Sequence, residues 1–257
     1  RVEAGSVAPP TGLEPPLALT AEQADALARS SDTLDKPAQE PRSFLLHGIT
    51  GSGKTEVYLQ AMHRVVQRGQ QALLLVPEIA LTPQTLERVN ARFPGRVGVV
   101  HSALTPRQRF DQWWNIQSGM YDVVVGPRSA LFAPLPRLGL IVIDEEHEWT
   151  YKQEEAPPLY HARTVALRLA QLTGTVVVLG SATPDVETYY RASRGRHRLL
   201  ELPRRIGETT GHGAPALPRV EVCDMRQELR EGNRSIFSRR LGQSLSDCVQ
   251  RGQQAIL

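Results

Sequence analysis

The sequence predicts an α/β fold, a mostly parallel sheet of about seven strands with helices on both faces. Most of the strand candidates are continuous runs of Val, Ile and Leu, as expected for strands covered on both faces of a parallel sheet. Helical segments separate several of these runs. Alternating strands and helices are typical of a parallel sheet with helices on both faces. The expected strands are residues 44–46, 72–76, 97–101, 122–125, 140–143, 175–179 and 199–202. The clearest expected helices are 56–68, 83–92, 106–118 and 160–172.

Composition fits an ordinary globular protein, with 40% hydrophobic and 22% charged residues among 257. The formal net charge of +3 is compatible with nucleic-acid binding but does not demand it. Cys223 and Cys248 stand 25 positions apart without a CxxC pair or Cys/His ligand spacing, so we expect neither a disulfide scaffold nor a metal site built on them, and a reducing cytoplasm is the default. No apolar run approaches the roughly eighteen residues that span a bilayer, and we expect no membrane partner.

A glycine-rich stretch, GITGSGKT at residues 48–55, lies between the first strand and the helix that follows it. This context and spacing are those of the phosphate-binding loop GxxxxGK[ST]. Backbone N–H groups of such a loop point at an anion, and the helix start adds its positive dipole end. Lys54 would contact the β and γ phosphates, and the Thr55 hydroxyl would hold Mg²⁺. The remaining loop residues expected to bind nucleotide are Gly48, Thr50, Gly51, Ser52 and Gly53. Chance coincidence is the alternative, and the flanking strand and helix argue against it.

A helix is expected to begin at Thr20, with Gln23 as the capping partner three residues later. Upstream of a phosphate loop, the Gln23 amide would also be able to read both hydrogen-bonding edges of adenine. Spacing alone leaves both roles open.

Carboxylates follow the apolar strand 140–143 at once, in Asp144 and Glu145. Because the carboxyl ends of parallel strands share one sheet edge, both would lie near the phosphate loop. Asp144 would reach the Mg²⁺ held by Thr55, and Glu145 would orient or deprotonate an attacking water. The alternative is an acidic helix start that complements the helix dipole.

The strand 175–179 is followed by Gly180-Ser181-Ala182-Thr183-Pro184. Ser181 and Thr183 are expected either to sense the γ-phosphate side of the pocket or to form a turn and a helix cap.

Taken in order and spacing, GITGSGKTE at 48–56, DEEH at 144–147 and GSATP at 180–184 resemble the motor domain of superfamily 2 helicases. The strings at 77–84, 126–134 and 151–163 are similar to the family of primosomal replication-restart helicases. The resemblance covers roughly residues 19–257. It implies a RecA-like lobe that binds ATP and Mg²⁺, with Lys54, Asp144 and Glu145 as catalytic residues, Thr55 and Asp144 at the metal, and Gln23 at adenine.

Members of this family hydrolyse ATP while moving 3′ to 5′ along single-stranded DNA, and they reassemble the primosome at stalled forks. The resemblance implies single-stranded and forked DNA, primosome proteins and single-stranded DNA-binding protein as partners, and a cytoplasmic, nucleoid-associated location. It also implies that residues 149–163 form a loop coupling DNA contact to hydrolysis. The residues expected to touch DNA or to couple it to ATP are Arg128, Ser129, Trp149, Tyr151, Lys152, Tyr160, Arg163, Ser181 and Thr183. Packing against the lobe is an equal alternative for the aromatic residues of the loop.

One sequence junction occurs twice, as QRGQQALL at 67–74 and QRGQQAIL at 250–257. Each predicts a helix that ends at Gly and a strand that follows. We expect a linker at 1–18, a first lobe at 19–202, a connector at 203–235 and the start of a second RecA-like lobe at 236–257. Within the connector, Arg204 and Arg205 are expected to be a solvated pair.

The chain starts with Arg1 rather than Met, which suggests a fragment. Superfamily 2 motors use an arginine from their second lobe during phosphoryl transfer, and the resemblance implies a zinc segment in that lobe. Neither is expected in these residues. We therefore expect this piece to hydrolyse ATP slowly. Two alternatives stay open, another superfamily 2 DNA translocase and a non-catalytic DNA-binding primosome scaffold. Intact Lys54, Thr55, Asp144 and Glu145 argue against the scaffold.

Overall fold

The computed structural model describes residues 15–35, 42–155, 157–206 and 220–257. The chain divides into two compact units, Arg1–Ala214 and Pro215–Leu257. Most of the expected linker 1–18 and part of the expected connector 203–235 lie outside the described residues, so these boundaries stay predictions.

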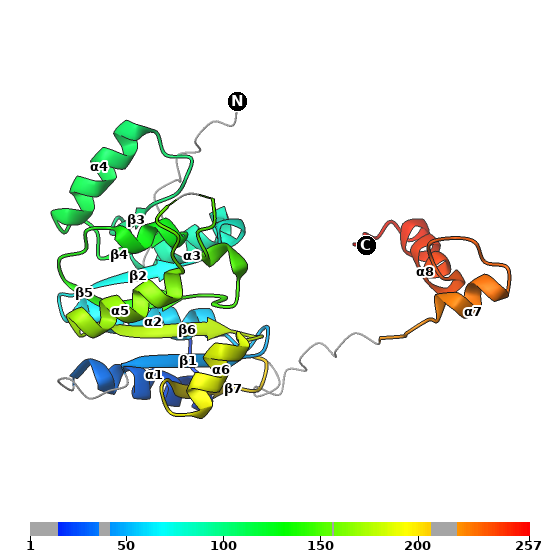
Figure 1. Ribbon diagram of the computed structural model, residues 1–257, viewed down its shortest axis with the longest axis horizontal. Helices are drawn as coiled ribbons and strands as arrows, with labels where there is room; N and C mark the ends of the chain where they lie inside the picture. The colour runs from blue at the N-terminus through cyan, green and yellow to red at the C-terminus, as the bar shows by residue number, and fades with distance from the viewer. Residues whose placement is uncertain (1–14, 36–41, 156, 207–219) are drawn as a thin grey trace. The chain divides into compact units, whose positions relative to one another are not determined.

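The first unit is built on a seven-stranded sheet in which every strand pair is parallel, as the sequence predicts (Figure 1). The order across the sheet is β3-β4-β2-β5-β6-β1-β7. The strands are β1 (Ser43–Gly48), β2 (Gln71–Leu75), β3 (Val97–Val99), β4 (Val123–Gly126), β5 (Leu138–Ile143), β6 (Val176–Ser181) and β7 (Arg198–Leu202).

Among the described residues of this unit, one α-helix precedes the first strand, and five α-helices and three short 3-10 segments lie between successive strands. The helices are α1 (Ala21–Asp35), α2 (Lys54–Gln67), α3 (Pro83–Arg92), α4 (Pro106–Gln117), α5 (Ala162–Thr173) and α6 (Val186–Ser193). The 3-10 segments are η1 (Glu78–Ala80), η2 (Arg128–Phe132) and η3 (Trp149–Tyr151). Helices α3 and α4 begin where expected because Thr82 and Thr105 cap them and a proline occupies the first turn of each.

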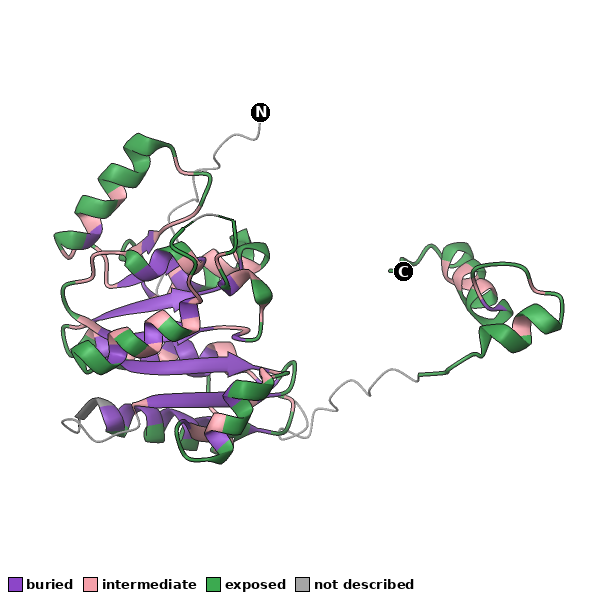
Figure 2. Ribbon diagram, viewed as in Figure 1, coloured by how far each residue is buried: buried purple, intermediate pink, exposed green. Residues whose placement is uncertain are grey.

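Side chains alternate along the buried strands and supply two cores, one on each face of the sheet. In β1, Phe44 and Leu46 join the core under α1, α2 and α3, whereas Leu45 joins the core under α4, α5 and α6. The strands are buried almost throughout (Figure 2). The covering helices therefore leave only the ends of the sheet open to a ligand.

Three neighbouring strands, β5, β6 and β1, run in the same direction and end at the same edge. The phosphate-loop sequence follows β1, the acidic cluster follows β5, and Ser181 ends β6. The topology thus gathers all three sequence motifs at one edge of the sheet.

The second unit contains α7 (Met225–Arg230) and α8 (Arg239–Gln250). Glu228 joins the two, since its carboxylate accepts hydrogen bonds from Asn233 and from the Arg239 backbone N–H. Helix α8 ends before Gly252 at φ 66°, just as α2 ends before Gly69 at φ 72°, which confirms the repeated helix end. The strand expected at 255–257 is not formed, because the described part of this unit offers no other strand to pair with it. None of the described helices is both long and apolar enough to cross a bilayer.

His197, between α6 and β7, is buried, and its Nδ1 lies 2.7 Å from the Ser43 hydroxyl. Burial, reinforced by Arg191 and Arg163, lowers the pKa of His197 from 6.5 to about 4. The folded state therefore holds a neutral ring where the unfolded chain takes up a proton. The contribution of His197 to the free energy of unfolding is fully present above pH 6.5 and is lost progressively as the pH falls toward 4.

We predict that His197→Gln, which keeps a hydrogen-bonding group but cannot titrate, flattens this loss of stability. Thermal unfolding between pH 7.5 and 4.5 would show a smaller fall in Tm for His197→Gln than for wild type. His63→Gln on α2 serves as the matched control and should follow the wild-type curve. Parallel curves for wild type and His197→Gln would contradict the assignment.

Candidate nucleotide site

The loop after β1 has the backbone conformation that an anion requires. Gly51 and Gly53 adopt left-handed φ angles of 83° and 78°, which glycine reaches without strain. Gly53 is the N-cap of α2, and no side chain caps the helix there, so its first N–H groups face the loop. The Ser52 hydroxyl is buried without a hydrogen-bond partner among the described residues. An unsatisfied buried donor at a helix N-terminus suits a bound phosphate oxygen.

Lys54 folds over this loop and donates from Nζ to the Gly48 carbonyl at 2.8 Å. Gly48 allows this because a Cβ there would lie 2.5 Å from the Ser52 hydroxyl oxygen and 3.2 Å from the Lys54 side chain. The ammonium group thus lies at the centre of the loop. A phosphate bound by the loop would replace the carbonyl as its partner.

Asp144 follows β5 and is held by two tyrosines and a backbone amide. Its Oδ1 accepts from the Tyr58 hydroxyl and from the Glu145 N–H, each at 3.1 Å, and its carbonyl oxygen accepts from the Tyr151 hydroxyl at 2.7 Å. Burial and the neighbouring Glu145 raise the pKa of Asp144, while Tyr58 and Lys54 partly offset the rise. A cation nearby would remove the cost of the buried negative charge.

Thr55 and Asp144 line the same cavity of about 70 Å³, between α2, α3 and the sheet. The structure therefore brings together the two groups expected at Mg²⁺. The donor set, a hydroxyl and a carboxylate, consists of the hard oxygen ligands that Mg²⁺ prefers.

Glu145 adopts a left-handed φ of 47°, which is rare for a residue with a side chain. The turn directs its carboxylate to within 3.7 Å of His147 Nδ1 and leaves the side chain 37% exposed. His147 in turn lies 2.7 Å from the Ser181 hydroxyl, which also accepts from the Thr183 N–H at 2.9 Å. The acidic cluster and the serine–threonine turn are thus one hydrogen-bonded unit. The sequence reasoning assigned no role to His147, although the histidine stands within the DEEH string.

Glu146 is fully buried, and the sequence reasoning missed its role too. Its carboxylate accepts from the Arg163 guanidinium at 2.6 Å, from the Thr188 hydroxyl at 2.9 Å and from the Asp185 N–H at 2.8 Å. Arg163 was expected to touch DNA or to couple it to ATP. Its side chain is 11% exposed and pairs with Glu146, because a buried carboxylate needs a cation beside it. The coupling role of Arg163 stays a prediction.

Gln23 lies against the phosphate loop with both ends of its amide engaged. Oε1 accepts from the Thr20 N–H at 2.8 Å, and Nε2 donates to the Ser52 carbonyl at 2.9 Å. The capping role of Gln23 is therefore present. Reading of adenine by this amide stays a prediction, and it would require Gln23 to exchange these partners.

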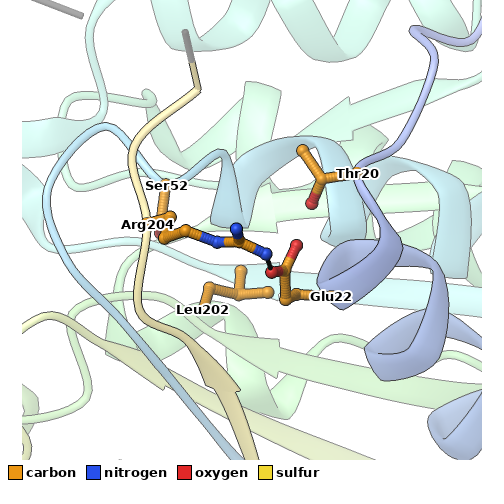
Figure 3. Close-up of a pocket in the computed structure, with 5 residues that line it drawn as sticks. All are labelled: Thr20, Glu22, Ser52, Leu202 and Arg204. Atoms are coloured by element: carbon orange, nitrogen blue, oxygen red, sulfur yellow. Dashed lines mark ion pairs between the residues drawn. The ribbon is translucent and has the colours of Figure 1, made fainter. Parts of the chain in front are cut away.

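Arg204 is exposed to solvent, as the sequence suggested, but it is also engaged in an ion pair. It forms an ion pair with Glu22 and lines a small pocket with Thr20, Ser52 and Leu202 (Figure 3). The next residues cross the phosphate loop, where the Ile206 N–H donates to the Gly51 carbonyl at 3.0 Å. The reason is topological: β7 pairs with β1, so the chain leaving β7 runs beside the loop that leaves β1.

The aromatic residues of the expected DNA-coupling loop face in different directions. Trp149 is 73% exposed, whereas Tyr151 is 1% exposed and supports Asp144 from the core. Tyr151 therefore packs against the lobe, the alternative that the sequence left open for the aromatic residues of this loop. Tyr160 packs edge-on against Phe132, with ring centroids 5.1 Å apart. Lys152 is exposed and pairs with Glu154 at 2.7 Å.

A second, larger cavity of about 560 Å³ lies at the carboxyl ends of β2, β3 and β4. Arg128, Ser129, Trp149 and Tyr160 line it, as do Arg109 and Glu78. Arg128 also supports the expected DNA-coupling loop, because its guanidinium donates to the carbonyls of Thr150 and Lys152 at 2.7 and 3.0 Å. Tyr151 lines the cavity as well, so five of the residues expected to touch DNA or to couple it to ATP share this cavity.

The fold is a parallel sheet with a phosphate loop after one strand and a carboxylate after the next strand but one. A serine–threonine turn is linked to that carboxylate segment. These features define a nucleotide-binding lobe of the P-loop class. The profile of the DEAD/DEAH box helicase family matches residues 25–192, which is more than half of the chain. The chain belongs to the DEAD/DEAH box helicase family.

Among curated proteins, the chain is similar to several named Replication restart protein PriA. It is 48% identical over 242 residues to that of Bacillus subtilis, 47% over 225 residues to that of Synechocystis, and 46% over 216 residues to that of Treponema pallidum. These matches cover 94%, 86% and 84% of this chain and 29%, 26% and 31% of the relatives. The chain thus spans less than a third of the length of each.

Two solved structures share the fold. RecG bound to a three-way DNA junction aligns with a TM-score of 0.55 at 23% identity, over 75% of this chain and 24% of that one. The Hef helicase domain of Pyrococcus furiosus aligns with a TM-score of 0.54 at 18% identity, over 81% of this chain and 44% of that one.

Proposed function

We propose that the chain is the ATP-binding lobe of an ATP-dependent DNA helicase that acts in replication restart. The observation that supports the proposal is the cavity that Thr55 of the phosphate loop and Asp144 both line, in a chain 46–48% identical to three PriA proteins. ATP hydrolysis, 3′ to 5′ movement and DNA unwinding are proposed for the whole protein.

In this proposal the loop N–H groups and Lys54 bind the triphosphate, and Thr55 and Asp144 hold the metal. Mg²⁺ would neutralise charge on the β and γ phosphates. Glu145 is the residue to orient and deprotonate water, since its half-exposed carboxylate stands next to Asp144 and within reach of His147. Through His147, a change at Glu145 would reach Ser181 and Thr183.

Single-stranded DNA is the proposed occupant of the larger cavity. Trp149 supplies an exposed ring on which a base can stack, and Arg128 supplies positive charge in the same cavity. Lys152 is proposed to add charge from the exposed part of the same loop. Forked DNA, primosome proteins and single-stranded DNA-binding protein are proposed as partners of the whole protein. We also propose a nucleoid-associated location in the cytoplasm, a zinc segment in the second lobe, and lobe boundaries at 202 and 236. Support for these finer points is the family resemblance.

Replacing Lys54 with Ala tests whether the protein is a motor or a scaffold. In the intact protein we expect the Lys54→Ala variant to lose about 100-fold in ATP turnover and to lose unwinding, because the phosphate charge is left uncompensated. Its Tm and its affinity for a single-stranded oligonucleotide should match wild type, which serves as the control for folding. A variant that still supports primosome assembly and restart at a wild-type level would favour the scaffold.

The contrast between Trp149 and Tyr151 tests the DNA assignment. We expect Trp149→Ala to weaken binding of a single-stranded oligonucleotide about tenfold, the loss of one stacked base, without lowering Tm. Tyr151→Ala should instead lower the free energy of unfolding by about 3–5 kcal/mol, because it empties a core position. Fluorescence anisotropy and thermal unfolding would measure the two effects. Wild-type oligonucleotide affinity in Trp149→Ala would contradict a DNA role for this loop.

A further inference from the structure

Tyr58 is a buried residue of α2 that touches two other motifs of the site. It lies one turn beyond Lys54 on the helix that starts at the phosphate loop, and only 2% of it is exposed. Its hydroxyl donates to Asp144 Oδ1 at 3.1 Å. A buried tyrosine hydroxyl needs a hydrogen-bond partner, so the partner that it has indicates what the residue does in the site.

The end of β6 is shaped to accept this phenol. A Cβ added at Gly180 would lie 2.6 Å from the Tyr58 Cζ, closer than real Cβ contacts, and would collide with the hydroxyl oxygen. Only glycine fits at this position. The Gly180 carbonyl also accepts from the Glu146 N–H at 2.9 Å, so the phenol end is enclosed by the segments that follow β5 and β6.

The hydrogen bonds around Asp144 are asymmetric. Within the described residues, both donors to the carboxylate, the Tyr58 hydroxyl and the Glu145 N–H, reach the same oxygen, Oδ1. Two donors on one oxygen restrain the rotation of the carboxylate and leave Oδ2 as the oxygen available to a ligand, and Asp144 and Thr55 line the same cavity. Hydrogen bonds of this kind orient the carboxylates of metal sites and tune their affinity.

We infer that Tyr58 is a positioning residue for the metal, which holds the Asp144 carboxylate so that Oδ2 faces the Mg²⁺ of bound ATP. Gly180 is the counterpart of Tyr58, since a side chain at position 180 would occupy the space of the phenol. The inference rests on the proposed function, because it requires a nucleotide-bound metal at Thr55 and Asp144. Simple packing is the competing account, and it assigns importance to the ring of Tyr58 and none to the hydroxyl.

Tyr58→Phe separates the two accounts, because it keeps the ring and removes the hydroxyl. The direct readout is the affinity for Mn²⁺, titrated by electron paramagnetic resonance into the intact protein saturated with a non-hydrolysable ATP analogue. We expect the Mn²⁺ dissociation constant to rise about tenfold in Tyr58→Phe, the lower end of the range for an outer hydrogen-bond partner. Affinity for the nucleotide without metal should not change.

Tyr121→Phe is the matched control, because Tyr121 packs against another glycine, Gly98, beside β3 and outside the site. It should leave the Mn²⁺ affinity at the wild-type value. Gly180→Ala, which displaces the phenol, should weaken Mn²⁺ binding as Tyr58→Phe does, and the double variant should be no weaker than either.

Mn²⁺ binding within twofold of wild type in Tyr58→Phe would overturn the inference and leave the proposed function intact. Failure of the wild-type protein to bind nucleotide and Mn²⁺ together would overturn the proposed function, and the inference with it. The Tm of each variant without ligands reports folding separately. A loss of Tm in Tyr58→Phe with unchanged Mn²⁺ affinity would establish the packing account.

Discussion

The parallel pairing of β5, β6 and β1 is the constraint on which the site depends. Each strand is apolar and buried on both faces, so polar chemistry is possible only where the strands stop. All three stop at one edge, and each is followed by a different kind of group: a loop of N–H donors, a carboxylate and a hydroxyl. Residues separated by nearly a hundred positions in the chain are neighbours for this reason alone.

Burial of charge explains the hydrogen bonds and ion pairs at this edge of the sheet. Asp144 and Glu146 are two carboxylates close to the core, and each is satisfied differently. Glu146 has a permanent cation in Arg163, together with Thr188 and a backbone N–H, and it is structural. Among the described residues, the hydrogen-bond donors to the Asp144 carboxylate are neutral, and its pKa is raised although Lys54 partly offsets the rise, so its charge is only partly compensated. The difference supports the proposal that Asp144 is the metal ligand, whereas Glu146 has a structural role.

The features that local sequence determines were predictable, and those that need tertiary packing were not. The strand runs, the phosphate loop and the proline-led helices carry their own signals, and the structure confirms them. The inward positions of Tyr151 and Arg163 were not predictable, because an aromatic residue or an arginine in a loop can face inward or outward at similar cost. The ion pair of Arg204 with Glu22 was missed because the position of Arg204 depends on the pairing of β7 with β1, which no local pattern encodes. Tyr58 was missed because its hydroxyl meets a partner 86 residues away.

The central claim is that the phosphate loop and Asp144 hold one metal–nucleotide complex between them. A crystal structure of the intact protein with ADP, Mg²⁺ and beryllium fluoride tests it most directly. The account predicts the phosphates within residues 48–55, the Thr55 hydroxyl in contact with the ion, and an Asp144 carboxylate oxygen within roughly 4 Å of it, the reach of one bridging water. A metal held with Asp144 turned away, or a nucleotide bound elsewhere, would contradict the account.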